Sequence, residues 1–216
     1  MTVVREGKVA IFLAGALASM FIGLGLVFNW DFIWFLLAIS GVAGVLSFLI
    51  FRDPRRSPPS DTTLVVSPAD GRVVALEPIS DPYVGERAVR ISIFLTLFDA
   101  HVNRCPCSGS VENTVYSPGA FHPAFDPRSP GDNEHTVIDI QNSRFRVRFK
   151  QIAGFLTRRI VNNLKPGETV RVGDRMGMII FGSRVEVVLP REMMTDIELR
   201  QQMRAGETVI GKRGDL

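Results

Sequence analysis

Two long uncharged stretches near the N-terminus constrain the fold of this chain more than any other feature. Residues Val9–Trp30 and Phe32–Phe51 contain no charged side chain. Each stretch has about 20 residues, enough to cross the hydrocarbon core of a bilayer as an α-helix. A polar break at residues 29–31 separates them. The sequence therefore predicts a membrane anchor over residues 1–51, made of two transmembrane helices.

Charged residues that flank the two stretches predict the orientation of this hairpin. Basic residues lie outside both stretches, whereas the turn carries only Asp31. The basic residues are Arg5, Lys8, Arg52, Arg55 and Arg56. Because positive charge favours the cytoplasmic side, both ends of the hairpin are expected in the cytoplasm, with the following domain facing it from the cell membrane. A cleaved signal peptide would explain the first stretch, but the second stretch and its basic flank argue against one.

The rest of the chain has the pattern of a linker followed by one β-rich domain. Residues 52–62 are rich in proline, which stops a helix and favours a short, stiff linker. Residues 63–216 have the length of a single domain. Phe145, Val147 and Phe149 alternate with basic residues, a period of two that is typical of a half-exposed strand. Further strands are expected at 71–76, 88–97 and 136–140, the last paired with 145–150, and a helix is expected near 156–164.

A weak internal repeat indicates the type of β-domain. Residues 165–174 resemble residues 204–211, and each segment reads as a strand, a glycine turn and a second strand. Such repeats are typical of small flattened barrels of the lipoyl and biotinyl type. Residues 176–179 lack the lysine that a carrier domain would modify, which argues against a carrier function. The predicted fold is mainly β, a compact barrel-sandwich-like domain preceded by the helical hairpin.

Charge and cysteine content argue against several classes of partner. The net charge is only +3 and the chain has no long Lys/Arg run, so nucleic-acid binding is not indicated. Cys105 and Cys107 are separated only by Pro106, and a disulfide across one residue would be strained. No His/Cys spacing suggests a metal site. We expect two reduced thiols and no bound metal.

Four short stretches carry the motifs that point to chemistry. Ile179–Pro190 reads as a buried strand, but Gly182 and Ser183 interrupt it, and a glycine inside a strand marks a bulge or a close backbone approach. The other three stretches are Phe51–Pro54, Ser67–Gly71 and Phe98–Arg104. In this order the four stretches resemble the phosphatidylserine decarboxylases, in particular their short, membrane-anchored form. The resemblance runs from Phe51 to about Pro190 and includes residues 154–160.

The resemblance implies that the chain is a proenzyme that cuts itself between Gly182 and Ser183. Ser183 Oγ would attack the preceding carbonyl, with Asp70 and His101 as the pair that takes up its proton. The resulting ester would eliminate, and the dehydroalanine left at position 183 would hydrolyse to a pyruvoyl group with loss of ammonia. Fragments 1–182 and 183–216 would then form a heterodimer, and the sequence leaves a higher oligomer open.

The resemblance also implies the reaction of the mature protein. The pyruvoyl group derived from Ser183 would form a Schiff base with phosphatidylserine, a membrane phospholipid, and release CO₂ and phosphatidylethanolamine in phospholipid biosynthesis. His101 is expected to supply the proton, because an imidazole has an ordinary pKa of about 6.5. Longer members of the family have a second histidine three residues on, where this chain has Arg104. His101 is therefore expected to serve both steps.

Three arginines are weaker candidates for binding the substrate. Arg184 replaces the family's usual Ser or Thr after the cleavage site, and would either attract the substrate's anionic groups or point to solvent. Arg158 and Arg159 would either hold a lipid phosphate or form a solvated face. Residues 118–133 form a Pro-rich loop that is long enough to act as a lid.

Three alternatives to this function stay open at the level of sequence. The first is decarboxylation of another serine-headgroup lipid, such as archaetidylserine. The second is a non-enzymatic, membrane-tethered barrel that serves as an adaptor and stays intact. The third is a serine hydrolase that uses Asp70, His101 and an unmodified Ser183.

Overall fold

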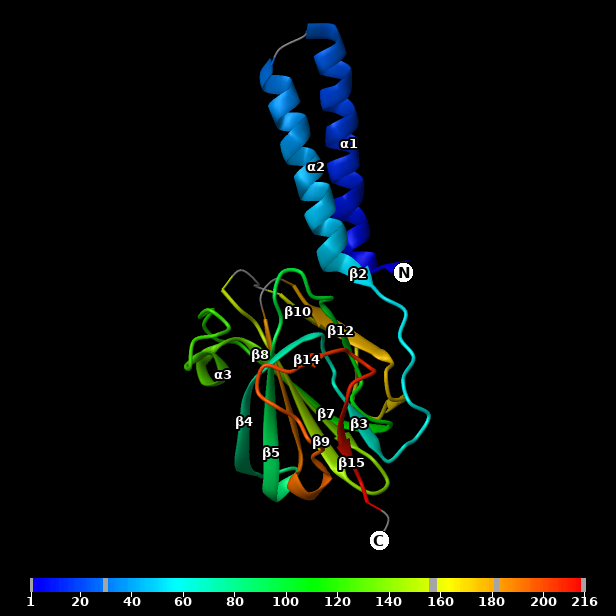
Figure 1. Ribbon diagram of the computed structural model, residues 1–216, viewed down its shortest axis with the longest axis vertical. Helices are drawn as coiled ribbons and strands as arrows, with labels where there is room; N and C mark the ends of the chain where they lie inside the picture. Colours follow the sequence, from blue (N-terminus) through cyan, green and yellow to red (C-terminus); the bar gives the residue numbers. More distant parts are fainter. Residues whose placement is uncertain (1, 29–30, 156–158, 181–182, 215–216) are drawn as a thin grey trace. The chain divides into compact units, whose positions relative to one another are not determined.

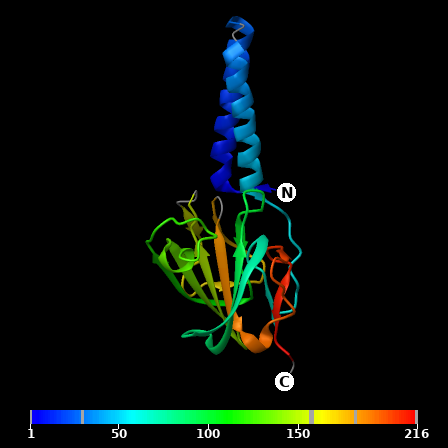
Figure 2. The ribbon, with the colours of Figure 1, turned by 60° about the vertical axis from the view of Figure 1, so that its left-hand side comes forward.

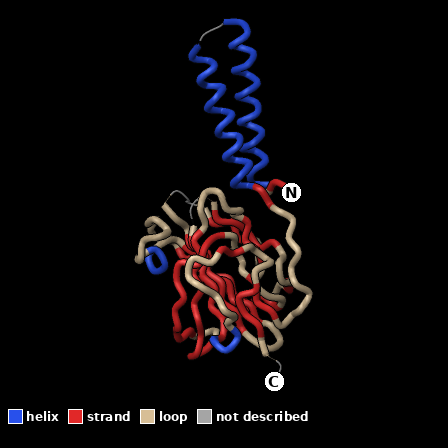
Figure 3. Tube along the Cα trace, viewed as in Figure 1, coloured by secondary structure: helices blue, strands red, loops and turns tan. Residues whose placement is uncertain are grey.

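The computed structural model describes residues 2–28, 31–155, 159–180 and 183–214 (Figure 1). The chain divides into two compact units, Met1–Arg55 and Arg56–Leu216. Each unit has its own secondary structure, helical in the first and mainly strands in the second (Figure 3). We call the second unit the β-domain.

The first unit is a pair of long helices, α1 (Arg5–Phe28) and α2 (Asp31–Phe51). Both are long and apolar enough to cross a membrane, which confirms the predicted pair of apolar helices. Asp31 lies in the first turn of α2, where a negative charge interacts favourably with the helix dipole. The strands β1 (Thr2–Val3) and β2 (Arg52–Asp53) pair antiparallel. They join the N-terminal end of α1 to the C-terminal end of α2. Asn29 and Trp30 lie outside the described residues.

The β-domain is built around one large antiparallel sheet. Its strands, in spatial order, are β11 (Thr169–Val170), β7 (Gly109–Ser117), β8 (His135–Gln141), β9 (Arg146–Ile152), β13 (Arg184–Pro190), β5 (Gly85–Phe94), β4 (Gly71–Asp81) and β14 (Gln202–Met203). The sheet curls into a half-barrel, which is seen from two sides in Figures 1 and 2. Mainly β architecture with barrel-like curvature confirms the predicted fold class.

Smaller elements complete the β-domain. A second sheet has the order β10 (Ile160–Asn162), β12 (Arg175–Ile179) and β6 (Val102–Arg104), and β15 (Val209–Lys212) pairs with β3 (Leu64–Val66). The short helices are α3 (Ser129–Asp132) and η1 (Arg191–Met193). The equivalent glycines of the predicted repeat, Gly167 and Gly206, both lie in turns, with φ angles of +86° and +76°.

Alternation along the strands places apolar side chains inside the curl and charged ones outside. Val147 and Phe149 of β9 are buried in the core, as the period of two predicts. On the outer face Arg148 binds Asp139 at 2.7 Å and Asp81 at 3.0 Å. The predicted pairing of 136–140 with 145–150 is confirmed, since Ile138 lies opposite Phe149. The outer face is therefore held by ion pairs and the inner face by packing.

Two local predictions differ from the structure. The helix expected near residues 156–164 is wrong where the chain is described, because Ile160–Asn162 forms β10 and pairs with β12. Two β-branched residues and an available strand edge outweigh the helical pattern there. The predicted strand 88–97 also ends earlier, because β5 finishes at Phe94.

The two cysteines pack in the core as free thiols. Cys105 and Cys107 are fully buried and form no disulfide. Burial raises the pKa of the Cys105 thiol to about 12 and raises that of Cys107 further. Because the thiolate is the reactive form, both side chains are inert in the folded protein.

Gly71 occupies a position that no other residue fits. Its φ angle is +137°, and an added Cβ would lie 2.3 Å from the carbonyl oxygen of Phe94. Gly85, at the far end of the same hairpin, has a similar φ of +131° with nothing within 4 Å of such a Cβ. The two glycines therefore separate the cost of the backbone angle from the cost of the clash.

We predict that Gly71→Ala destabilises the protein more than Gly85→Ala does. The unfavourable φ angle alone is expected to cost about 1–3 kcal/mol, and the clash at Gly71 adds to it because β5 must shift. Thermal unfolding in detergent, followed by circular dichroism, measures both. Equal losses for the two variants would contradict the close approach of Gly71 to β5.

Candidate active site

The Gly-Ser step lies where the chain passes from one sheet to the other. β12 ends at Ile179 in the three-stranded sheet, and β13 begins at Arg184 in the middle of the large one. The stretch that reads as a single interrupted strand is thus two strands in two sheets. Phe181 and Gly182 lie outside the described residues, so the predicted cleavage position is described only from Ser183 onward.

Ser183 lies directly before β13, at the end of a central strand of the large sheet, with its side chain buried. Its carbonyl oxygen accepts a hydrogen bond of 2.9 Å from Leu95 N, and the next residue, Arg184, pairs with Phe94 and Ile152. The residue has no exposed surface, and its Oγ has no hydrogen-bond partner among the described residues. Strand alternation puts Ser183 on the same face as the core residue Val185. The structure thus presents a buried hydroxyl that is not engaged elsewhere in the described chain.

His101 lies beside the other end of the same connection. It directly precedes β6, and its carbonyl oxygen accepts a hydrogen bond of 3.3 Å from Ile179 N. Its side chain is completely buried, including both ring nitrogens. The short connection that leads to Ser183 begins at Ile179, the last residue of β12, and Ile179 is hydrogen-bonded to His101. The two predicted residues therefore lie at either end of one short connection.

Asp70 directly precedes β4 of the large sheet, and the described hydrogen bonds of its carboxylate are to Arg56 and Ala205. Its carboxylate accepts two hydrogen bonds from Arg56 Nη2, of 2.8 and 2.6 Å, and one of 2.7 Å from Ala205 N. Gly71 packs against Phe94, next to the residue that binds the Ser183 carbonyl. The role of Asp70 in orienting His101 stays a prediction.

Arg56 is the residue that sequence reasoning missed. Read as one of the basic residues after the second apolar stretch, it is instead mostly buried, and it binds Asp70 and, at 3.3 Å, Glu207. The backbone nitrogen of Ser57 donates a second hydrogen bond of 3.0 Å to Glu207. The sequence shows that Arg56 lies in a Pro-rich linker, but a single sequence does not show that it pairs with a distant acidic residue.

Arg184 does not point to solvent. Its side chain is buried, and its Nη2 donates to Ser92 Oγ at 2.7 Å and lies 3.1 Å from Glu186 Oε1. Ser92 Oγ in turn donates to Glu186 Oε1 at 3.2 Å. Strand alternation places Arg184 on the face opposite to Ser183, where it lines a cavity of about 360 Å³ together with Arg90. The proposed binding of substrate by Arg184 stays a prediction.

The two weaker arginine candidates, Arg158 and Arg159, and the chain's two other histidines, His122 and His135, belong to other segments. Arg159 is exposed, and Arg158 lies outside the described residues. His122 lies 3.7 Å from Asp132 in the Pro-rich loop, and His135 Nδ1 lies 2.7 Å from Asn133 O. The loop is fastened to the sheet, since Asn133 Nδ2 donates to Ala153 O at 2.7 Å and Lys150 Nζ to Pro130 O at 2.6 Å.

An apolar cavity of about 410 Å³ lies at the end of β5, next to the strand that begins after Ser183. Its wall includes Leu95, whose backbone nitrogen binds the Ser183 carbonyl. The lining residues are Phe94, Leu95, Thr96, Leu97, Pro123, Ala124, Phe125 and Phe155. Such a cavity suits the apolar part of an amphipathic molecule whose polar end reaches the sheet edge.

Fold and site place the chain among mainly β proteins that carry two helices long enough to span a membrane. The family model described as phosphatidylserine decarboxylase matches residues 46–211. A protein of Chlorobium chlorochromatii named phosphatidylserine decarboxylase proenzyme is 44% identical over 180 residues, covering 83% of this chain and 84% of its own. Its namesake in Prosthecochloris aestuarii is 42% identical over 168 residues, with 78% and 77% covered. This chain belongs to the phosphatidylserine decarboxylase family.

We predict that Arg56→Gln loosens the segment that follows the helices. Loss of the charged partner leaves Asp70 with only its backbone hydrogen bond, at an expected cost of about 2 kcal/mol in unfolding free energy. Limited digestion with the broad-specificity protease proteinase K and thermal unfolding measure the change. The exposed neighbour Arg55 provides the matched control, Arg55→Gln. If the two variants behave alike, the ion pair does not anchor this segment.

Proposed function

We propose that this chain is a membrane-anchored proenzyme that cuts itself between Gly182 and Ser183 and then decarboxylates phosphatidylserine to phosphatidylethanolamine. The β-domain would act at the cytoplasmic face of the cell membrane, as the charges around the helices favour. The observation that carries the proposal is the buried Ser183 hydroxyl at the connection between two sheets, which has no hydrogen-bond partner among the described residues, in a chain of this family.

The residues around Ser183 support self-cleavage on chemical grounds. Attack of Oγ on the preceding carbonyl forms an ester and breaks the amide, with the hydroxyl proton passing to a base. His101, buried at the start of the same connection, is the proposed base. Burial favours the sequence of steps because it keeps water away from the acyl carbon, where water would hydrolyse the ester before it eliminates. Elimination of the ester and hydrolysis then leave a pyruvoyl group at position 183 and release ammonia.

The environment of Ser183 fits a pyruvoyl group. Position 183 faces the core side of the sheet, and its carbonyl oxygen is fixed by Leu95 N, so a ketone formed there would be held rigidly. The group supplies an electron sink for the pair of electrons left behind when CO₂ departs. The chain's own contribution is to orient the headgroup at the sheet edge, to exclude water, and to return a proton through His101.

β13 explains how the two fragments would stay together after cleavage. It pairs with β5 along Arg184–Pro190 and with β9 along Arg184–Val188, so it is bound on both sides. Val185, Val187 and Leu189 are fully buried, and burial of each side chain contributes roughly 1.5–3 kcal/mol. A break before Ser183 leaves all of these interactions intact, which supports a heterodimer of 1–182 and 183–216.

We predict that Ser183→Ala stays as one chain of about 23.9 kDa and is inactive. Removing Oγ removes both the nucleophile and the atom that is converted to the ketone. Intact mass spectrometry of the expressed protein is the measurement, with the wild type expected as two fragments and a blocked N-terminus on the smaller one. An intact wild-type chain that carries a free serine would contradict the proposal and favour a serine hydrolase or an adaptor.

We also predict that Asp70→Asn slows self-cleavage by at least about tenfold, because a neutral amide orients and stabilises an imidazolium less well than a carboxylate does. Arg56→Gln is the matched control, since it breaks the same ion pair but keeps the carboxylate. Time courses of fragment formation separate the two variants. Equal slowing in both would assign Asp70 to anchoring of the linker and would remove it from the catalytic machinery.

Decarboxylation of archaetidylserine instead of phosphatidylserine is the second candidate. The apolar cavity beside Leu95 and Leu97 favours neither ester nor ether tails. Competition between the two lipids in mixed micelles, read out as CO₂ release, decides which substrate is preferred.

A further inference from the structure

Large apolar side chains are exposed around the edge of the β-domain that holds Ser183. Leu97 and Phe98 lie in the turn after β5, and Phe125, Phe155 and Leu199 come from three other segments. We call these five residues the apolar rim. Phe98 is 69% exposed, Phe125 78%, Phe155 61% and Leu199 60%. In the described part of the β-domain, every exposed phenylalanine or leucine belongs to this rim.

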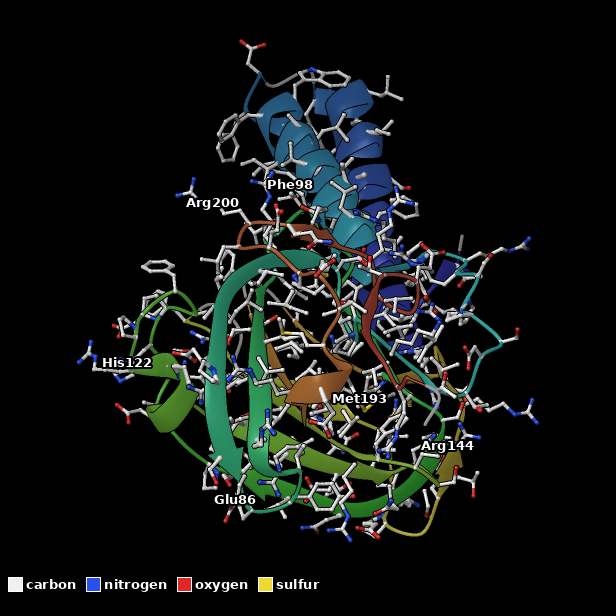
Figure 4. All side chains as sticks on the ribbon, turned by 60° about the horizontal axis from the view of Figure 1, so that its bottom comes forward. Glu86, Phe98, His122, Arg144, Met193 and Arg200 are labelled. Atoms are coloured by element: carbon white, nitrogen blue, oxygen red, sulfur yellow. The ribbon has the colours of Figure 1, made fainter. Side chains whose placement is uncertain are left out.

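The rim is one structure and not a scatter of single residues. Leu97, Phe125 and Phe155 line the same apolar cavity next to the Ser183 strand. The segment that carries Leu199 is tied to the turn of Phe98 through a hydrogen bond of 3.5 Å from Gln202 Nε2 to Asp99 Oδ1. Figure 4 labels Phe98 and the neighbour of Leu199, Arg200, at the same end of the domain. A contiguous exposed apolar surface of this kind marks an interaction site.

Two exposed arginines lie close in sequence to rim residues. Arg200 follows Leu199, Arg159 lies four residues after Phe155, and both are exposed. Arg200 has a φ angle of +69°, the only positive value among the described non-glycine residues, and its backbone nitrogen is held by Val73 O at 2.8 Å. Aromatic and aliphatic side chains that are flanked by arginines match the chemistry of a lipid headgroup interface.

The linker limits what this surface can meet. Arg56 is bound to Asp70 and Glu207 within the β-domain, so only residues 52–55 separate it from the end of α2 at Phe51. Five Cα–Cα steps span at most about 18 Å. If α2 crosses a bilayer, the β-domain is therefore confined to the surface of that bilayer, which is present at high effective concentration.

We propose that the apolar rim inserts into the headgroup interface of the bilayer that holds α1 and α2. A phospholipid would then keep its acyl chains in the bilayer and along the apolar cavity while its headgroup reaches the sheet edge at Ser183. This proposal rests on the proposed function for the identity of the lipid, but insertion of the rim does not require catalysis. Its occupant is the bilayer, and a second copy of the chain is the outcome that would contradict it.

Depth-dependent quenching tests the insertion directly. Phe98→Cys in the full chain, labelled with a nitrobenzoxadiazole fluorophore, is reconstituted into vesicles of phosphatidylcholine and phosphatidylserine that carry nitroxide-labelled lipids. The native thiols of Cys105 and Cys107 are buried and do not compete for the label. Met194→Cys, at the opposite end of β13 and partly exposed, is the matched control.

Strong quenching at position 98 and little at position 194 is the expected result. Quenching that is equal at the two positions, or absent at 98, overturns the proposal, and absence of quenching together with a signal that depends on protein density assigns the rim to contact between copies. Repeating the measurement with Ser183→Ala present shows whether insertion stands when self-cleavage is removed.

A comparison of substrates tests the consequence for catalysis. Phe98→Ser with Leu199→Ser removes two rim residues that do not line the cavity. We expect about a tenfold loss of decarboxylation on vesicle phosphatidylserine, and unchanged rates on a short-chain, monomeric phosphatidylserine. Met194→Ser is the control for both substrates. Equal loss on the two substrates contradicts the rim's role, whereas a wild type that is inactive on both contradicts only the proposed function.

Discussion

The pairing of β13 with β5 on one side and β9 on the other fixes the position of Ser183, the residue on which the candidate site depends. β13 is central in the large sheet, and its first residue, Arg184, lies opposite Phe94 and Ile152. That register places Ser183 at the end of the central strand and brings its carbonyl oxygen within hydrogen-bond distance of Leu95 N. A shift of one residue would turn the Ser183 side chain to the outer face, because strand side chains alternate with a period of two. The geometry of one strand therefore decides whether the hydroxyl is buried or solvated.

Buried charge on the outer face makes that register costly to change. Arg184, Ser92 and Glu186 bind one another beneath the Pro-rich loop, and a slip of β13 would separate the arginine from its partners. An unpaired buried charge is strongly unfavourable, whereas an apolar replacement of the whole group need not be. In this structure the group contributes to specifying one alignment of β13. Arg184 directly follows Ser183, the residue that is proposed to react. The alignment of β13 therefore positions both the polar cluster and the buried hydroxyl.

The sequence predicts the elements of this fold better than their arrangement. The helices α1 and α2 follow from length and hydropathy, and β9 follows from the alternation around Phe149. These features are local, so one sequence contains them. The separation of β12 and β13 into two sheets depends on long-range pairing with β6 and β5, which periodicity does not encode. For the same reason the pattern favoured a helix near Ile160, where the available edge of β12 decides for a strand.

The candidate site shows the same division. Residue types and order predict Ser183, His101 and Asp70 as site residues, and in the structure the connection from Ile179, which binds the His101 carbonyl, leads to Ser183. The partner of Asp70 was not predictable, because Arg56 belongs to the linker and reaches the carboxylate only in the folded domain. The ion pair of Arg56 with Asp70, 14 residues apart in sequence, joins the segment after α2 to the start of β4 in the large sheet. The length of free linker between α2 and the β-domain is therefore set by that pair and not by the proline content of residues 52–62.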